Sequence, residues 1–117
     1  MNPEEQIIAI AKACGWKKSL GDWKAPAGTT VKIVREASDG DAYTYPPDYL
    51  NDLNAMHEAE KTLDANEQCF YQAYLYKVVG VHPSSIFAED IHKLFCATAT
   101  QRAEAFLRVM GLYRDSL

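Results

Sequence analysis

Apolar residues recur at helical spacing in four segments of the chain, and the first segment has the clearest boundaries. It opens with Asn2 as the expected cap and Pro3 at the first helical position, where a missing amide hydrogen costs nothing. Glu5 is placed to reach back to the cap. An apolar stripe follows, and Gly15 suits the left-handed residue that ends a helix. The pattern predicts a helix between Asn2 and Gly15.

Two later segments are bounded in the same way. Asp64 and Glu67 have the spacing of a reciprocal capping box, and Thr98 with Gln101 repeats it. Apolar residues then recur every three or four positions until a glycine stops each run. The two stripes comprise Phe70, Tyr71, Tyr74, Leu75, Val78 and Val79, and then Ala99, Ala103, Phe106, Leu107 and Met110. We expect two helices whose tyrosines are core aromatics with solvated hydroxyl tips.

The segment from Pro46 to Leu63 is predicted to be one helix on which the others pack. Its two prolines would occupy the first turn. One side carries an apolar stripe: Tyr49, Leu53, Met56, Ala59 and Leu63. The other side is polar: Asn51, Asn54, His57, Glu58 and Lys61. This polar face is the candidate site for a partner or ligand, because amide, acid and base side chains lie close together on it.

Glycine and proline divide the region between the first two helices into short pieces. Residues 23–25 and 30–35 are predicted to be two strands joined by a turn at 25–29, and residues 36–45 a loop. Residues 92–97, a short and bounded apolar run, are predicted to be a further strand. This order of elements predicts an α+β fold: a small α/β/α layered sandwich of three or four short, mostly antiparallel strands covered by about four helices.

Length and composition favour one folded domain spanning residues 1–117, because 48% of the residues are apolar. No apolar run reaches the length of a membrane span, and the acidic start does not resemble a signal peptide, so we expect a soluble, cytoplasmic protein. Cys14, Cys69 and Cys96 all lie in apolar segments and are expected to be buried and reduced. No two cysteines have the spacing of a metal or redox motif.

The net charge of −4 hides two blocks of opposite sign. Residues 12–35 carry six basic side chains against one acid, and residues 36–67 carry nine acids against one base. The basic block could contact nucleic acid, but an isoelectric point of 5.3 and the lack of a nucleic-acid-binding motif count against this. The acidic block could instead mimic nucleic acid and bind a basic host protein. Both blocks are also typical of ordinary solvated faces.

Catalysis or metal binding would have to begin at His57 with neighbouring carboxylates such as Glu58. The segment HEAEK lacks the second histidine that a zinc protease helix carries one turn later. His57 and Glu58 are adjacent, so their side chains diverge by about 100° on a helix. A small enzyme or a metal-binding protein using this face is therefore an alternative to a binding module. No catalytic set, metal site or cofactor is predicted.

Three stretches together resemble the phage ABA sandwich domain family: IAKACGW around Cys14, PDYLNDLNAMHEAEKTL at 47–63, and ATATQRAEAFLRVMGLY at 97–113. The resemblance covers a little over a third of the chain. It implies a small α/β/α sandwich encoded by a bacteriophage or prophage, and it implies no reaction. The leading hypothesis is thus a non-enzymatic accessory or interaction protein that binds a host or phage protein in the bacterial cytoplasm. Exposed aromatics such as Tyr43, Tyr45 and Tyr113 would also suit a homodimer.

Overall fold

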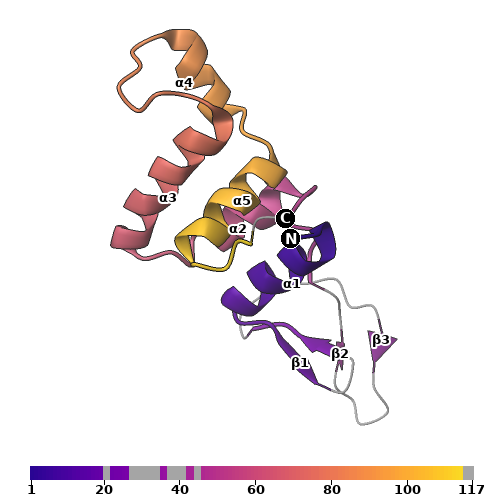
Figure 1. Ribbon diagram of the computed structural model, residues 1–117. Helices are drawn as coiled ribbons and strands as arrows, with labels where there is room; N and C mark the ends of the chain where they lie inside the picture. The colour runs from indigo at the N-terminus through magenta and orange to yellow at the C-terminus, as the bar shows by residue number, and fades with distance from the viewer. Residues whose placement is uncertain (20–21, 27–34, 37–41, 44–45, 115–117) are drawn as a thin grey trace.

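A computed structural model describes residues 1–19, 22–26, 35–36, 42–43 and 46–114 (Figure 1). The helices are α1 (Pro3–Ala13), α2 (Leu53–Glu60), α3 (Ala65–Val79), α4 (Ala88–Phe95) and α5 (Ala99–Val109). The strands are β1 (Lys17–Ser19), β2 (Asp22–Lys24), β3 (Arg35–Glu36) and β4 (Ala42–Tyr43). β1 pairs antiparallel with β2, and β3 pairs antiparallel with β4.

The helices pack mainly on one another. α5 lies against α1, α2 and α3, and α4 packs on α3 at one end of the molecule (Figure 1). The strand pairs lie at the opposite end, beyond α1, with β2 against β4. The α+β class is therefore confirmed, but each sheet in the described part of the chain has only two strands. The predicted layered sandwich differs from this arrangement, because strands of two or three residues offer too little apolar surface for helices to cover.

Small side chains let α5 act as the centre of the core. Ala103 and Ala105 are fully buried, as are Phe106 and Leu107 in the next turn. Ile10 from α1 and Met56 from α2 complete the most buried group. The alanines allow neighbouring helices to approach closely, while the larger side chains fill the space between them.

The predicted helix boundaries at both capping boxes are confirmed. Glu67 N donates to Asp64 Oδ1 at 2.8 Å, and the Glu67 carboxylate accepts from Asp64 N at 2.9 Å. Thr98 and Gln101 exchange the same two hydrogen bonds. α1 begins as predicted, with Asn2 Oδ1 accepting from Glu5 N at 2.8 Å. These ends form where expected because each hydrogen bond joins residues three positions apart.

The prediction of one helix from Pro46 to Leu63 is wrong at its start. α2 begins at Leu53, and its cap is Asp52, whose side chain accepts from Ala55 N at 3.1 Å. Before it, the chain makes a separate turn, in which Asp48 O accepts from Asn51 N and Asp52 N at 3.1 and 2.8 Å. The side chain of Asp52 binds the amide of Ala55, which has no partner within the helix, and this cap determines where the helix starts. The two prolines do not determine it.

Most of the predicted apolar stripe in this region is nevertheless buried. Tyr49, Met56, Ala59 and Leu63 are all in the core, but Leu53 is 40% exposed. Tyr49 reaches the core from the turn before α2, so the stripe does not depend on a continuous helix. The tyrosine expectation also needs correction on α3, because the Tyr71 hydroxyl is buried and not solvated.

The predicted strand at 92–97 is also wrong, because these residues form the second half of α4 and its end. Apolar side chains at Phe87, Ile91, Leu94 and Phe95 recur at helical spacing. Acids in the first turn and basic side chains in the last turn further stabilise a helix through its dipole. This pattern is visible only when the segment is extended back to Phe87.

The short strands differ from the predicted ones. β2 overlaps the predicted strand 23–25, but its partner β1 is missing from the predicted elements. The predicted loop 36–45 contains paired residues of β3 and β4. Residues 27–34, which include three of the five residues of the predicted turn and most of the second strand, lie outside the described residues.

The cysteine prediction holds for at most one of the three thiols. Cys14 is half-buried, and burial raises the pKa of its thiol, while Cys69 and Cys96 are exposed. Cys69 lies on the outer side of α3, and Cys96 caps the end of α4. Among the described helices, none is long and apolar enough to cross a membrane.

Candidate functional site

A groove of about 770 Å³ lies between α2, α3, α4 and α5. Its walls are mainly apolar, and its polar side chains come mostly from α2, α3 and α5. The lining residues are His57, Glu60, Lys61, Leu63, Gln68, Tyr71, Gln72, Leu75, Tyr76, Ile91, Leu94, Phe95 and Arg102. The groove thus joins residues separated by up to 45 positions in the sequence.

An ion pair between Glu60 of α2 and Arg102 of α5 lies at one side of the groove. Arg102 Nη1 is 3.3 Å from Glu60 Oε1, and the two side chains are 11% and 21% exposed. The same Glu60 oxygen lies 3.7 Å from Nδ1 of His57, which is about half exposed. One carboxylate therefore faces two basic side chains and links α2 to α5.

Arg102 also holds the end of α4. Its Nε donates to Ala97 O at 3.2 Å, and its Nη2 reaches the carbonyls of Leu94 and Phe95 at 3.5 Å. The last carbonyls of a helix have no partner within the helix and carry its negative dipole end, so a guanidinium suits them. Arg102 thereby positions the helix that forms one wall of the groove.

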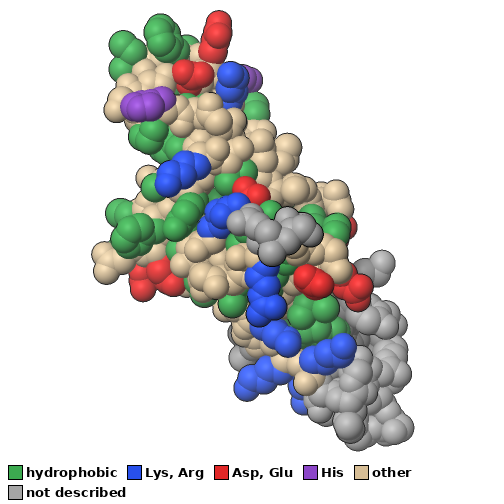
Figure 2. All heavy atoms as spheres, in the orientation of Figure 1, with side chains coloured by type: hydrophobic (Ala, Val, Ile, Leu, Met, Phe, Trp, Pro, Cys, Tyr) green, Lys and Arg blue, Asp and Glu red, His purple; other side chains and the backbone are tan. Residues whose placement is uncertain are grey.

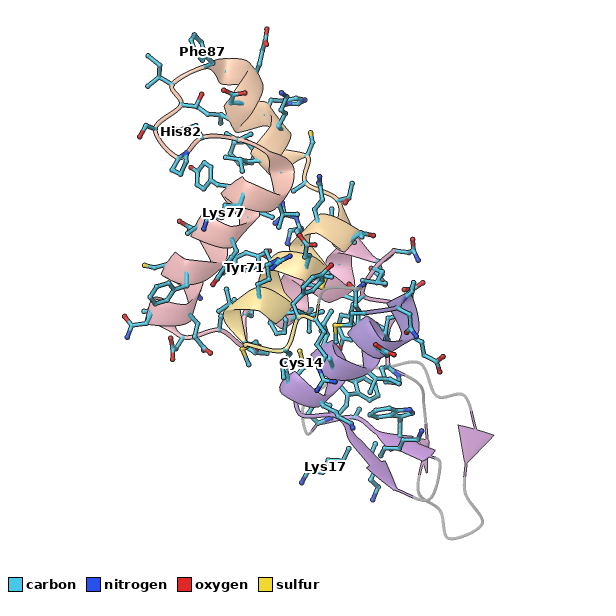
Figure 3. All side chains as sticks on the ribbon, in the orientation of Figure 1. Cys14, Lys17, Tyr71, Lys77, His82 and Phe87 are labelled. Carbon is cyan, nitrogen blue, oxygen red and sulfur yellow. The ribbon has the colours of Figure 1, made fainter. Side chains whose placement is uncertain are left out.

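Tyr71 places a hydroxyl beside this ion pair. The side chain extends from α3 toward α5 and is 6% exposed (Figure 3). Its hydroxyl is buried and has no hydrogen-bond partner of good geometry within the described part of the chain. Burial raises the pKa of Tyr71, and the charge of Glu60 raises it further against the opposing effect of Arg102. The phenol therefore stays protonated, beside the Glu60 carboxylate and the Arg102 guanidinium.

Glu60 is the acidic side chain that lines the groove. Glu60 is engaged by Arg102, so it is not free to act as a general base for a substrate. No cysteine lines the groove. Among the described residues, no three side chains of histidine, cysteine, aspartate or glutamate are grouped so that they could hold a metal ion.

The structure brings two of the five candidate side chains on the predicted polar face into the groove, His57 and Lys61. Asn51 instead donates to Asp48 Oδ2 at 2.8 Å and fixes the turn before α2. Glu58 pairs with Lys61 at 2.8 Å on the open surface. Asn54 is exposed and lies outside the groove. The five residues therefore do not form one site.

The three residues of the buried polar cluster in the groove are missing from the predicted site: Glu60, Tyr71 and Arg102. Arg102 pairs with Glu60, which lies 42 positions earlier in the sequence. Glu60 falls at the edge of the apolar stripe of α2, where a carboxylate needs a partner when the helix packs. The position of Glu60 in the sequence therefore indicates that its carboxylate needs a basic partner. The sequence spacing does not indicate which basic residue that partner is.

The outer side of α4 and the loop before it expose an unusual amount of apolar surface. Ile86, Phe87, Ile91 and Phe95 are all exposed, and α4 has no fully buried residue. We call these four residues the α4 patch. Hydrophobic side chains gather on this end of the molecule, over the loop between α3 and α4 (Figure 2). Ile91 and Phe95 also line the groove, so the two surfaces are continuous.

Comparison with known proteins finds no match: neither a family model, nor a curated protein, nor a solved structure is similar to this chain.

Proposed function

We propose that this chain is a small, non-enzymatic binding module whose groove receives an apolar segment of a protein partner. The groove volume of about 770 Å³ lies within the range of roughly 300–1,000 Å³ that is typical of ligand sites. Seven of its thirteen lining residues are aliphatic or aromatic, and the other six are polar or charged. Such surfaces bind by burying apolar side chains and use the polar groups for orientation.

The continuity of the groove with exposed apolar side chains of α4 carries this proposal. A site for a small metabolite would normally enclose it, whereas this groove opens onto Ile91 and Phe95, which are 44% and 77% exposed. An amphipathic helix or an extended apolar segment could cover both at once. Lys61 and His57 at the α2 end would then favour a partner segment with an acidic residue at that position.

The biological setting is part of the same proposal. The proposal of a phage or prophage accessory protein is supported by a resemblance. The stretches around Cys14, at 47–63 and at 97–113 resemble the phage ABA sandwich domain family. We propose that it acts in the bacterial cytoplasm on a host or phage protein. Two of these stretches contribute groove residues, namely His57, Glu60, Lys61 and Leu63 from the second and Arg102 from the third.

The other functions suggested by the sequence receive less support. An enzyme or metal site built on His57 and Glu58 would need these side chains to converge, but Glu58 is paired with Lys61 on the surface. An acidic mimic would present unengaged carboxylates. Asp52 and Asp64 instead cap helices, and Asp48 accepts a hydrogen bond from Asn51.

Affinity capture from bacterial lysate tests the groove against the outer side of α2. A tag at the N-terminus leaves the groove clear, because this terminus lies away from α4 (Figure 1). We expect one stoichiometric protein partner, and we expect the groove variant Lys61→Ala/Tyr76→Ala to bind the purified partner about tenfold more weakly or worse. Asn54→Ala, on α2 but outside the groove, is the matched control and should bind normally. Adding Glu58→Ala to it extends the test to the outer polar face, because Glu58 also pairs with the groove residue Lys61.

The possible outcomes separate the two surfaces. Weakened binding in Asn54→Ala/Glu58→Ala with normal binding in the groove variant would overturn the groove proposal in favour of the outer polar face. Absence of any stoichiometric partner would also count against a binding module.

A further inference from the structure

His92 and Cys96 form a pair of metal-ligating side chains at the end of α4. They are four positions apart, so they lie one above the other on the same side of the helix. Nε2 of His92 is 3.4 Å from the Cys96 sulfur, and Nδ1 is 4.0 Å from it. Both residues are exposed, and neither lines the groove. The proposed function therefore makes no use of this pair.

The separation of these two atoms suits one tetrahedral metal ion. Zinc binds thiolate sulfur at about 2.3 Å and imidazole nitrogen at about 2.0–2.1 Å, so tetrahedral angles place the two atoms about 3.5 Å apart. The observed 3.4 Å between sulfur and Nε2 is close to that value. Cys96 N donates to His92 O at 2.9 Å and keeps the two residues in helical register. Only the exposed ring has to turn, so that the lone pair of Nε2 faces the ion.

The charges around the pair favour a cation. Cys96 caps α4, and the carbonyls at the end of a helix carry the negative end of its dipole. Glu89 is exposed and lies three positions before His92, so it adds a negative charge on the same side of the helix. Lys93 is adjacent to His92, so the two side chains diverge by about 100°. The Lys93 ammonium lies 3.9 Å from the Asp90 carboxylate, which offsets its charge.

We propose that His92 and Cys96 bind one Zn²⁺ ion, with water in the two remaining coordination positions. The Cys96 thiol releases its proton to solvent when its sulfur binds the ion, and His92 binds through its neutral ring. Among the described residues, no third histidine, cysteine, aspartate or glutamate joins the pair. The site is therefore open, unlike the closed four-ligand sites of structural zinc, and it binds more weakly than they do.

A bound ion would stabilise α4. This helix has eight residues and none of them is buried, and helices this short are marginal without packing. An ion held by residues four positions apart forms a cross-link over the last turn. Leu94 and Phe95 lie between the two ligands and line the groove, so the same cross-link holds one wall of the groove in place.

Isothermal titration calorimetry of the full, reduced chain with Zn²⁺ tests the site. Wild type should bind one ion per chain, and His92→Ala and Cys96→Ser should each bind at least about tenfold more weakly. Cys69→Ser is the matched control, because Cys69 is also an exposed thiol but lies on α3, and it should bind normally. Far-UV circular dichroism verifies that each variant retains its helices. Unchanged binding in His92→Ala or Cys96→Ser, or one ion per two chains, would overturn the site.

Two further readouts report on the ligand atoms and on the helix. Zn²⁺ should slow the alkylation of Cys96 and leave that of Cys69 unchanged, because a metal-bound thiolate is not free to react. It should also slow amide hydrogen exchange in α4. Alkylation of Cys96 at the same rate with and without Zn²⁺ would rule out its sulfur as a ligand.

The metal site and the proposed function fail separately. Absence of zinc binding overturns the site and leaves partner capture by the groove untouched. The groove variant Lys61→Ala/Tyr76→Ala should bind Zn²⁺ as the wild type does, because neither residue belongs to the pair.

Discussion

Replacing Arg102 with methionine removes the group that links α2, α4 and α5 while keeping most of its aliphatic stem. In the wild-type chain the guanidinium faces Glu60 at 3.3 Å and donates to Ala97 O at 3.2 Å. The variant leaves the Glu60 carboxylate with His57, at 3.7 Å, and the Tyr71 hydroxyl beside it. It also removes the donor that satisfies the last carbonyls of α4.

The expected loss follows from the burial of the pair. Breaking a fully buried ion pair costs about 3–5 kcal/mol, but Glu60 retains 21% exposure, so solvent reduces this to about 2 kcal/mol. The hydrogen bond to Ala97 adds about 1 kcal/mol, and the two contacts at 3.5 Å add little. A total of about 3 kcal/mol corresponds to a fall in Tm of roughly 10 °C for a chain of this size.

Urea unfolding gives the free energy, and amide hydrogen exchange shows where the structure loosens. We expect faster exchange in α4 before the other helices. Arg108→Met is the comparison on the same helix, because its pair with Glu104 is longer, at 3.7 Å, and more exposed, and its stacking on Tyr113 at 4.3 Å is partly solvated, so it should cost only about 1 kcal/mol. A loss for Arg102→Met no larger than this, with unchanged exchange in α4, would refute the assigned role.

Three further outcomes are expected. Tyr71→Phe removes a buried hydroxyl that lacks a hydrogen bond of good geometry, although it lies beside Glu60 and Arg102, and should change the free energy of unfolding by less than about 0.5 kcal/mol in urea unfolding, whereas Tyr49→Phe, whose hydroxyl interacts with Cys14, should destabilise the chain by about 1 kcal/mol; equal losses in both variants would contradict this. Alkylation followed by mass spectrometry should modify Cys69 and Cys96 faster than Cys14 in the folded chain, because Cys14 is half-buried and its pKa is raised, and equal rates at all three thiols would be inconsistent with the packing. Burial raises the pKa of Cys14, Tyr49 and Tyr71 above their ordinary values of 9.0 and 10.0, so the folded state holds protons that the unfolded chain releases. Stability should be complete below about pH 9, should fall as the pH rises above 10, and should fall less steeply in Tyr71→Phe; a flat urea midpoint across this range would contradict it.

Local hydrogen bonds explain which parts of the fold can be predicted from the sequence. The starts of α1, α3 and α5 depend on a cap and a residue three positions later, so they are encoded within a few residues. The positive φ at Gly15 and Gly80 is equally local. The start of α2 is harder, because Pro46 and Asp52 both suit a helix start and the turn between them decides in favour of Asp52.

The groove could not be predicted because it depends on contacts between distant residues. Glu60 and Arg102 are 42 positions apart, and several other basic residues could have been the partner. The α4 patch was missed for a different reason. Apolar residues were expected to lie in the core, so the short run at 92–97 was assigned to a buried strand, while the structure exposes Phe95 on a helix.

Amide NMR during titration with the captured partner tests most directly whether the groove is the binding surface. The largest shift changes should fall on groove residues from three helices, at Lys61 of α2, Gln72 and Tyr76 of α3 and Ile91 of α4. Changes confined to Asn51, Asn54 and Glu58, or to the strands beyond α1, would contradict binding in the groove.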